Sequence, residues 1–340
     1  MRRSHLFLLT LCLAIASPLT AALSLNPLNW FDGEEETPSL STTNSAQASE
    51  AAAILGSAKQ KLESGSNRSA NRSFKKIIKD YPTTDAAAEA LFLRARILMS
   101  NERWVKAFDS LQRIVNEHPA YPDFDKVISS QFDCATALME GARGKILWVF
   151  PGFKQYSTAA YQFERIVGNA PYGDYAPLAL MNVALVSEME EEPEDAIDAL
   201  DRLINYYPQS MLAPDAYYNL AKTYANLVKG SDYDQGSTRQ AISYYEDFLI
   251  LFPQSNYIGQ VESNLKDMEN LLATSRLNLG NFYYYYRSNN TAALIFYNEV
   301  ITIAPESSAA EEAQLRITDI ETGVRPVSGA SLVRKLLFAD

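Results

Sequence analysis

One spacing recurs six times along the chain: an alanine is followed twelve residues later by a proline. The pairs are Ala70/Pro82, Ala107/Pro119, Ala159/Pro171, Ala196/Pro208, Ala241/Pro253 and Ala293/Pro305. Bulky apolar residues follow each alanine at positions 4, 7 and 8, as in Phe74, Ile77 and Ile78. These positions share one face of an α-helix. A proline cannot continue a helix and pushes its predecessor out of the α region, so the spacing predicts six amphipathic helices with sharp ends.

A first helix is predicted before these second helices. Small residues mark where it would approach its partner, and these are Ala58, Ala95, Ala184, Ala221 and Gly280. In three repeats the two small residues are twelve apart, so the turn is short and the helices are antiparallel. The sequence therefore predicts helix pairs at 50–82, 84–119, 122–171, 174–208, 211–253 and 256–305, with a capping helix at 306–322.

The intervals between successive repeat prolines are 37, 52, 37, 45 and 52 residues. A tetratricopeptide repeat has a period of about 34 residues. The long intervals predict insertions at Gly141–Gln155 and Lys229–Ser237 and an extended first helix over roughly Ile258–Arg287. The order of alanine, aromatic residue and proline resembles the tetratricopeptide repeat. This resemblance implies an all-α fold, a right-handed superhelical solenoid of about six helix pairs plus the capping helix.

Charge narrows the classes of partner. The chain has 30 Lys and Arg against 41 Asp and Glu, a net charge of −11. A nucleic-acid partner requires a basic surface to neutralise phosphates, so the composition argues against one.

The N-terminus predicts an export signal at 1–22. Arg2 and Arg3 precede the apolar run Leu6–Ala16, and small residues follow. Cleavage after Ala22 is favoured over cleavage after Ala16, and an uncleaved membrane anchor is the alternative. A disordered linker is expected at 23–49, the solenoid at 50–322 and a C-terminal tail at 323–340.

Residues that carry chemistry are scarce. Cys12 falls inside the signal, so Cys134 is the only thiol of the mature chain, and its apolar context predicts a buried, inert side chain. His118 is the only mature histidine and is interpreted as structural. The acidic run Glu188–Glu194 is interpreted as a solvated turn, at a helix start where carboxylates are favourable. No zinc cluster or phosphate loop is present. We expect no catalysis and no cofactor or metal. A peptidoglycan lyase, the enzyme considered, needs a compact domain that the 18 residues after Thr322 do not hold.

The last repeat carries a closer resemblance. Leu277–Tyr284, Ala292-Ala293, Ala304-Pro305 and Ala309–Ala313 are similar to the C-terminal repeat of the BamD family of outer-membrane β-barrel assembly factors. Two further segments, Phe74–Pro82 and Ala86–Arg96, are similar to its first repeats, and the resemblance covers about residues 50–322.

The resemblance implies a protein-binding scaffold in the periplasm, at the inner face of the outer membrane. Its partners would be a β-barrel insertase, other assembly-machine subunits and unfolded outer-membrane protein segments. The family normally carries a lipid anchor on a cysteine, whereas Leu9-Thr10-Leu11-Cys12 departs from that motif because Leu11 is large. The sequence leaves lipid anchoring open. The alternative function is a different periplasmic repeat adaptor that coordinates envelope or peptidoglycan processes.

Repeat geometry predicts that the first helices line a concave peptide-binding groove. The candidate groove residues are Lys59, Phe92, Arg96, Met99, Met181, Leu185, Tyr218, Lys222, Leu277, Asn281 and Tyr284. Their aromatic and basic side chains suit an extended segment that ends in an aromatic residue and a carboxylate. The alternative for Phe92, Met181 and Leu277 is a place in the core between repeats. Of the run Tyr283–Tyr286, at least one side chain is expected to face solvent or a partner.

Overall fold

The computed structural model describes residues 45–142, 145–146, 150–151, 154–231 and 235–324, and all its helices belong to one compact unit, Thr43–Asp340. The helices are α1 (Ser45–Glu63), α2 (Asn67–Asp80), α3 (Asp85–Ser100), α4 (Trp104–Glu117), α5 (Phe124–Met139), α6 (Tyr156–Asn169), α7 (Tyr175–Met189), α8 (Pro193–Tyr206), α9 (Ala213–Leu227), α10 (Gln235–Leu251), α11 (Ile258–Asn281), α12 (Asn290–Ile303) and α13 (Ser308–Glu321). A π-helical turn, η2 (Phe282–Tyr286), follows α11.

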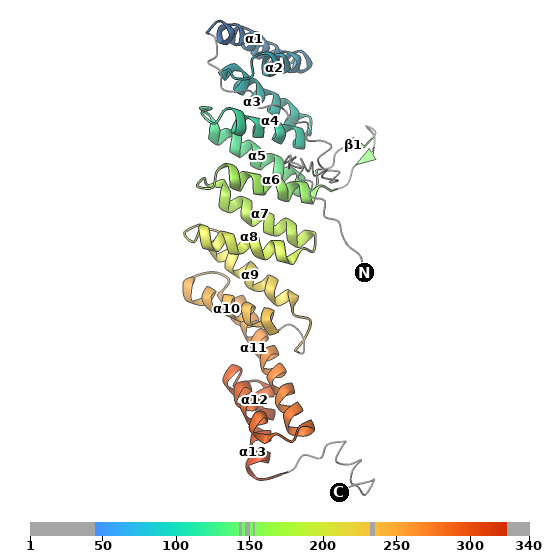
Figure 1. Ribbon diagram of the computed structural model, residues 1–340, viewed down its shortest axis with the longest axis vertical. Helices are drawn as coiled ribbons and strands as arrows, with labels where there is room; N and C mark the ends of the chain where they lie inside the picture. Colours follow the sequence, from blue (N-terminus) through green and yellow to red (C-terminus); the bar gives the residue numbers. More distant parts are fainter. Residues whose placement is uncertain (1–44, 143–144, 147–149, 152–153, 232–234, 325–340) are drawn as a thin grey trace, which may run out of the picture. The chain divides into compact units, whose positions relative to one another are not determined.

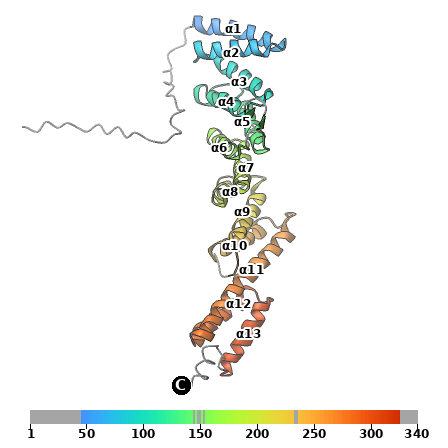
Figure 2. The ribbon, with the colours of Figure 1, turned by 90° about the vertical axis from the view of Figure 1, so that its right-hand side faces the viewer.

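Each helix packs against the next one along the chain, from α1 through α13 (Figure 1). Figure 2 shows the same succession after a quarter turn. The all-α solenoid of six helix pairs with a capping helix, α13, is confirmed. The predicted signal peptide, most of the linker and most of the tail lie outside the described residues.

Two boundaries differ from the sequence predictions, and one predicted insertion contains a short strand pair. Helix α1 begins at Ser45, so the last five residues of the predicted linker are helical. Helix α10 begins at Gln235, inside the insertion predicted at 229–237. Within the other insertion, the described residues form a short antiparallel pair, β1 (Lys145–Ile146) with β2 (Phe150–Pro151), in which Ile146 faces Phe150.

The repeated alanines lie where the sequence predicts close helix contact. All six are fully buried, and so are the residues at positions 4 and 7 after them, which are at most 1% exposed. Position 8 lies at the margin of the core, because only Ile78 and Ile204 are buried there. The helix face predicted from spacing is therefore confirmed, with its edge at position 8.

The prolines end helices as predicted. The residue before each proline leaves the helical conformation, as at Tyr81 (φ −135°, ψ 50°) and Ala304 (φ −140°, ψ 75°). Its N–H still donates to the carbonyl four residues back, for example from Tyr81 to Ile77 at 2.9 Å. Thr84 then caps α3 by accepting a hydrogen bond from the N–H of Ala87 at 3.2 Å. One helix thus ends and the next begins with only four residues between them.

Helix α5 is a first helix in which the expected bulky apolar residue is missing. Ala135 is fully buried at the close-contact position, and Gln131, four residues earlier, is fully buried too. The Gln131 amide donates to Oε1 of Gln112 at 3.0 Å and accepts from Asn169 Nδ2 at 2.9 Å. A buried amide is tolerated when it is hydrogen-bonded. This network joins α4, α5 and α6.

The buried side chains form three clusters, and none of the described helices is long and apolar enough to cross a membrane. The first cluster extends from α1 to α9, the second from α9 to α11 and the third from α11 to α13. Cys134 is fully buried in the first, and burial raises the pKa of its thiol to about 12. A thiol that remains protonated is a poor nucleophile, so Cys134 acts as a small apolar side chain.

Candidate functional site

The first candidate surface lies on α1, α3 and the segment before α5. We call it the N-terminal patch, and it consists of Lys59, Glu89, Phe92, Arg96, Met99 and Tyr121. Lys59 Nζ lies 2.7 Å from Glu89 Oε1, and the Tyr121 hydroxyl donates to Glu89 Oε2 at 2.6 Å. The rings of Phe92 and Tyr121 are 6.1 Å apart. Glu89 therefore holds three segments of the solenoid together at this surface.

The open part of the N-terminal patch combines a cation with apolar surface. Arg96 is exposed and follows Phe92 by one turn of α3, so the two side chains are neighbours on the helix. Phe92 and Met99 are half-buried. A guanidinium binds a carboxylate through paired hydrogen bonds, and a thioether adapts to varied apolar side chains. This arrangement suits a ligand with an anionic group beside an apolar one.

Glu89 is expected to make the stability of the patch pH-dependent. Partial burial by itself would raise its pKa, but hydrogen bonds from Lys59 and Tyr121 outweigh that effect and hold the pKa below its usual value. A lowered folded-state pKa contributes stability above the unfolded pKa, and this is lost as pH falls through the folded value. Glu89→Gln should therefore lower the melting temperature at neutral pH and lose most of that effect near pH 3. A difference that persists at pH 3 would contradict this ionic role.

The second candidate surface is a cavity of about 340 Å³ among α9, α10 and α11. Tyr218 and Lys222 line it, as predicted for the groove, and the Tyr218 ring stacks on Tyr257 with centroids 5.1 Å apart. Four lining residues that sequence reasoning missed are Gln260, Asn264, Asp267 and Met268. Their spacing of 0, 4, 7 and 8 is that of one helix face, a signal within the long first helix that could have found them.

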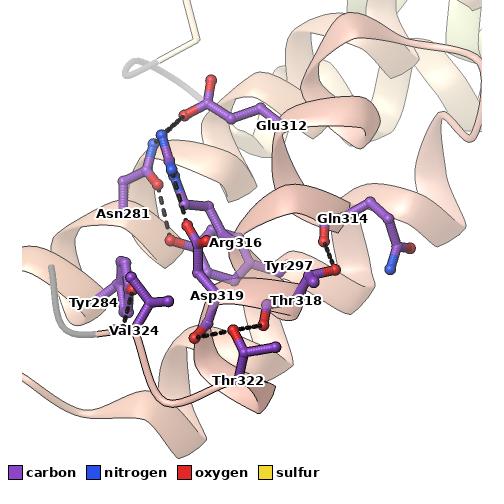
Figure 3. A network of polar contacts seen from close by, with 10 residues as sticks. All are labelled: Asn281, Tyr284, Tyr297, Glu312, Gln314, Arg316, Thr318, Asp319, Thr322 and Val324. Atoms are coloured by element: carbon purple, nitrogen blue, oxygen red, sulfur yellow. Dashed lines mark hydrogen bonds and ion pairs between the residues drawn. The ribbon is translucent and has the colours of Figure 1, made fainter.

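Three further predicted groove residues, Leu277, Asn281 and Tyr284, lie in the packed contacts of the core. Leu277 is 7% and Tyr284 2% exposed, so neither side chain is available to a ligand. Asn281 accepts a hydrogen bond from the Tyr297 hydroxyl at 2.8 Å, and its amide lies 3.4 Å from Glu312 Oε1 (Figure 3). Tyr284 donates to the carbonyl of Val324 at 2.9 Å. Here the structure places the predicted residues in the contacts that hold α11, α12 and α13 together.

The π-helical turn sets the direction of the tyrosine side chains that follow Asn281. A π-helical turn accommodates more residues than an α-turn and so changes the direction of the side chains that follow it. Within η2, Tyr284 is buried and Tyr283 stacks on Phe296 at 5.4 Å, whereas Tyr286 is 74% exposed. The tyrosine run is thus divided between core and solvent, as expected from its four directions on a helix.

The remaining candidates lie on α7. Met181 is half-buried, with its sulfur 3.9 Å from the amide of Asn219 on α9, and Leu185 is 36% exposed. Of the predicted groove residues, the structure brings Phe92, Arg96 and Met99 together on α3 beside Lys59, and Tyr218 with Lys222 on α9. Along the chain, the first helices α5 and α7 come between these two surfaces.

A family model described as an outer membrane lipoprotein, YfiO, matches residues 153–322, half of the chain. The chain belongs to the YfiO family. A tetratricopeptide-repeat model matches residues 55–123, and this range includes the N-terminal patch. The range matched by the YfiO model includes the cavity among α9, α10 and α11.

Curated relatives of this YfiO-family chain are named outer membrane protein assembly factor BamD, which confirms the BamD-like resemblance. The protein of Rickettsia prowazekii (strain Madrid E) is 31% identical over 132 residues, 38% of this chain and 52% of that protein. The Xylella fastidiosa (strain 9a5c) protein is 24% identical over 138 residues, 38% of this chain and 47% of that one. The chain spans about half the length of these relatives.

Two solved tetratricopeptide-type structures are similar at lower identity. YrrB, described as a TPR protein with an unusual peptide-binding site, is 15% identical with a TM-score of 0.31, over 71% of this chain and 97% of that one. MamA from Desulfovibrio magneticus RS-1 is 15% identical with a TM-score of 0.32, over 61% and 97%. At these TM-scores the likeness supports no conclusion about the function of this YfiO-family chain.

Proposed function

We propose that this chain is a non-catalytic scaffold of outer-membrane protein assembly, which docks a β-barrel insertase, unfolded barrel segments or both. The observation that carries the proposal is the YfiO-family match over residues 153–322, together with relatives named as assembly factors. The proposed location is the periplasm, at the inner face of the outer membrane.

The N-terminal patch is the proposed binding site for an extended segment of a barrel precursor. The exposed guanidinium of Arg96 would pair with a terminal carboxylate, while Phe92 and Met99 would contact the aromatic residue that precedes it. Lys59 is already paired with Glu89, so its role is to hold the patch in place and not to bind the anion. The cavity beside Tyr218 and Lys222 is a second proposed peptide contact.

The patch is tested by the variant Phe92→Ala/Arg96→Ala in the full chain. Its affinity for a labelled peptide that ends in an aromatic residue and a free carboxylate should fall about thirtyfold or more. Removal of a buried anchor and of a charge-assisted pair each typically costs about 1–3 kcal/mol, and tenfold corresponds to about 1.4 kcal/mol. Fluorescence anisotropy measures the dissociation constant.

The matched control is Arg72→Ala, which removes an exposed arginine from α2, a second helix outside the patch. Its affinity should equal that of the parent. Amidation of the peptide's C-terminus should weaken parent binding and leave the double variant unchanged. Unaltered affinity of the double variant would disprove the patch as the peptide site.

A further inference from the structure

A second cavity, of about 360 Å³, lies among α6, α7 and α8, away from the N-terminal patch. Its lining is unusually acidic. The carboxylates are Glu164 on α6, Glu190 and Glu192 at the turn between α7 and α8, and Asp195 and Asp198 on α8. Part of the acidic run that the sequence presents as a solvated turn therefore borders a half-open cavity of the size that binding sites have.

The negative charge of this cavity is only partly neutralised within the chain. Arg202 pairs with Glu164 at 2.7 Å and with Asp198 at 3.2 Å. Glu190, Glu192 and Asp195 have no cationic partner within the described ranges. The pKa of Glu192 is raised by desolvation and by its neighbours Asp195 and Glu190, the result expected of like charges held close together. Three carboxylates are left for a cation that comes from outside.

Two uncharged side chains complete the cavity. Ser187 on α7 lines it, is only 3% exposed, and its hydroxyl has no hydrogen-bond partner among the residues that the structure describes. Its oxygen is not among the fully buried unpartnered atoms of the described residues, so it opens to the cavity and is available to accept a hydrogen bond there. Tyr161 on α6 also lines the cavity and is 61% exposed, so a face of its ring is open to a cation.

We propose that this cavity binds an arginine side chain of an extended peptide segment from a partner protein. A guanidinium matches the cavity better than a metal ion does. It spreads its five N–H donors over several carboxylates and a hydroxyl, and it stacks on an aromatic ring. A metal ion needs three or more ligands that converge, and no such group occurs in the described ranges. The site goes beyond the proposed function, because its ligand has the opposite charge to that of the N-terminal patch.

The test measures binding of a labelled heptapeptide of alternating glycine and arginine to the full chain by fluorescence anisotropy. The variant Glu190→Gln/Glu192→Gln should raise the dissociation constant about tenfold or more, because it removes two of the three free carboxylates. Tyr161→Ala should weaken binding severalfold and Tyr161→Phe should retain it. The glutamine variant should melt no lower than the parent, since it relieves like-charge repulsion.

The matched control, Glu311→Gln/Glu321→Gln, removes the same charge from exposed positions on α13. Its dissociation constant should stay within about twofold of the parent's, as expected for exposed charges that do not contact the ligand. An equal loss in both double variants would show attraction to overall charge and overturn the site. Unchanged binding by the Glu190→Gln/Glu192→Gln variant would overturn it as well, as would displacement of the peptide by millimolar Ca²⁺. Failure of the barrel-peptide experiment leaves these outcomes unaffected.

Discussion

Replacing Phe163 by alanine is expected to lower the free energy of unfolding by about 3–5 kcal/mol. Phe163 is fully buried on α6, four residues after the repeat alanine Ala159, and its ring lies 5.4 Å from that of Phe132 on α5. The substitution removes the ring's buried surface and leaves a cavity within one helix pair, between α5 and α6, which close packing does not fill. Urea unfolding followed by circular dichroism measures the change.

Tyr172→Ala is the control for the Phe163 variant. Tyr172 is fully exposed just after α6, so its truncation should change the free energy of unfolding by less than about 0.5 kcal/mol. In a solenoid each repeat contacts only its neighbours, so faster amide exchange in the Phe163 variant should be concentrated in α5, α6 and α7. A loss below about 1 kcal/mol would contradict the central place of this ring in the core.

The second large effect is expected at Gly280 on α11. A Cβ at this position would lie 2.6 Å from Cε1 and 2.7 Å from Cδ1 of the Tyr297 ring. That ring is fully buried and its hydroxyl donates to Asn281, so it has little room to move. Gly280→Ala should therefore destabilise the protein by about 1–3 kcal/mol, as overpacking does. In an open helix the same change stabilises by up to about 1 kcal/mol.

Gly259→Ala, in the same helix, is expected to stabilise the protein and not to destabilise it. An added Cβ at Gly259 meets nothing within 4 Å, so only the gain in helix propensity remains. Thermal unfolding of the two variants should shift in opposite directions. If both were stabilising, the close approach of α11 to Tyr297 would be disproved.

Much of this fold is predictable because the helical period appears directly in the sequence. Buried positions recur at 0, 4 and 7 after each repeat alanine, and prolines end the helices where the backbone requires it. First helices are harder to predict. Helix α5 has Gln131 where α1, α3, α7 and α9 have bulky apolar residues, and no pattern shows that Gln112 and Asn169 will satisfy its amide.

The candidate site is less predictable than the fold. Helix phase places Lys59, Phe92 and Arg96 on the first helices, and the structure finds them together. The same rule fails at Leu277 and Tyr284, which are buried. Tyr284 lies within the π-helical turn, and the absent Cβ of Gly280 lets α11 approach Tyr297 of α12 closely. A regular period cannot anticipate a local change of helix type.

The sequence by itself determined the class of this protein, namely helix pairs with one alanine–proline spacing and few residues that carry out chemistry. These properties are local, since they depend on 3.6 residues per turn and on proline's missing N–H. The tertiary structure alone decided which side chains remain available for a partner. Glu89 joins Lys59 to Tyr121, and five carboxylates from two helices and the turn between α7 and α8 line one cavity. Contacts of this kind depend on how neighbouring helices pack, because charges that are far apart in the chain interact only when they are close together in space.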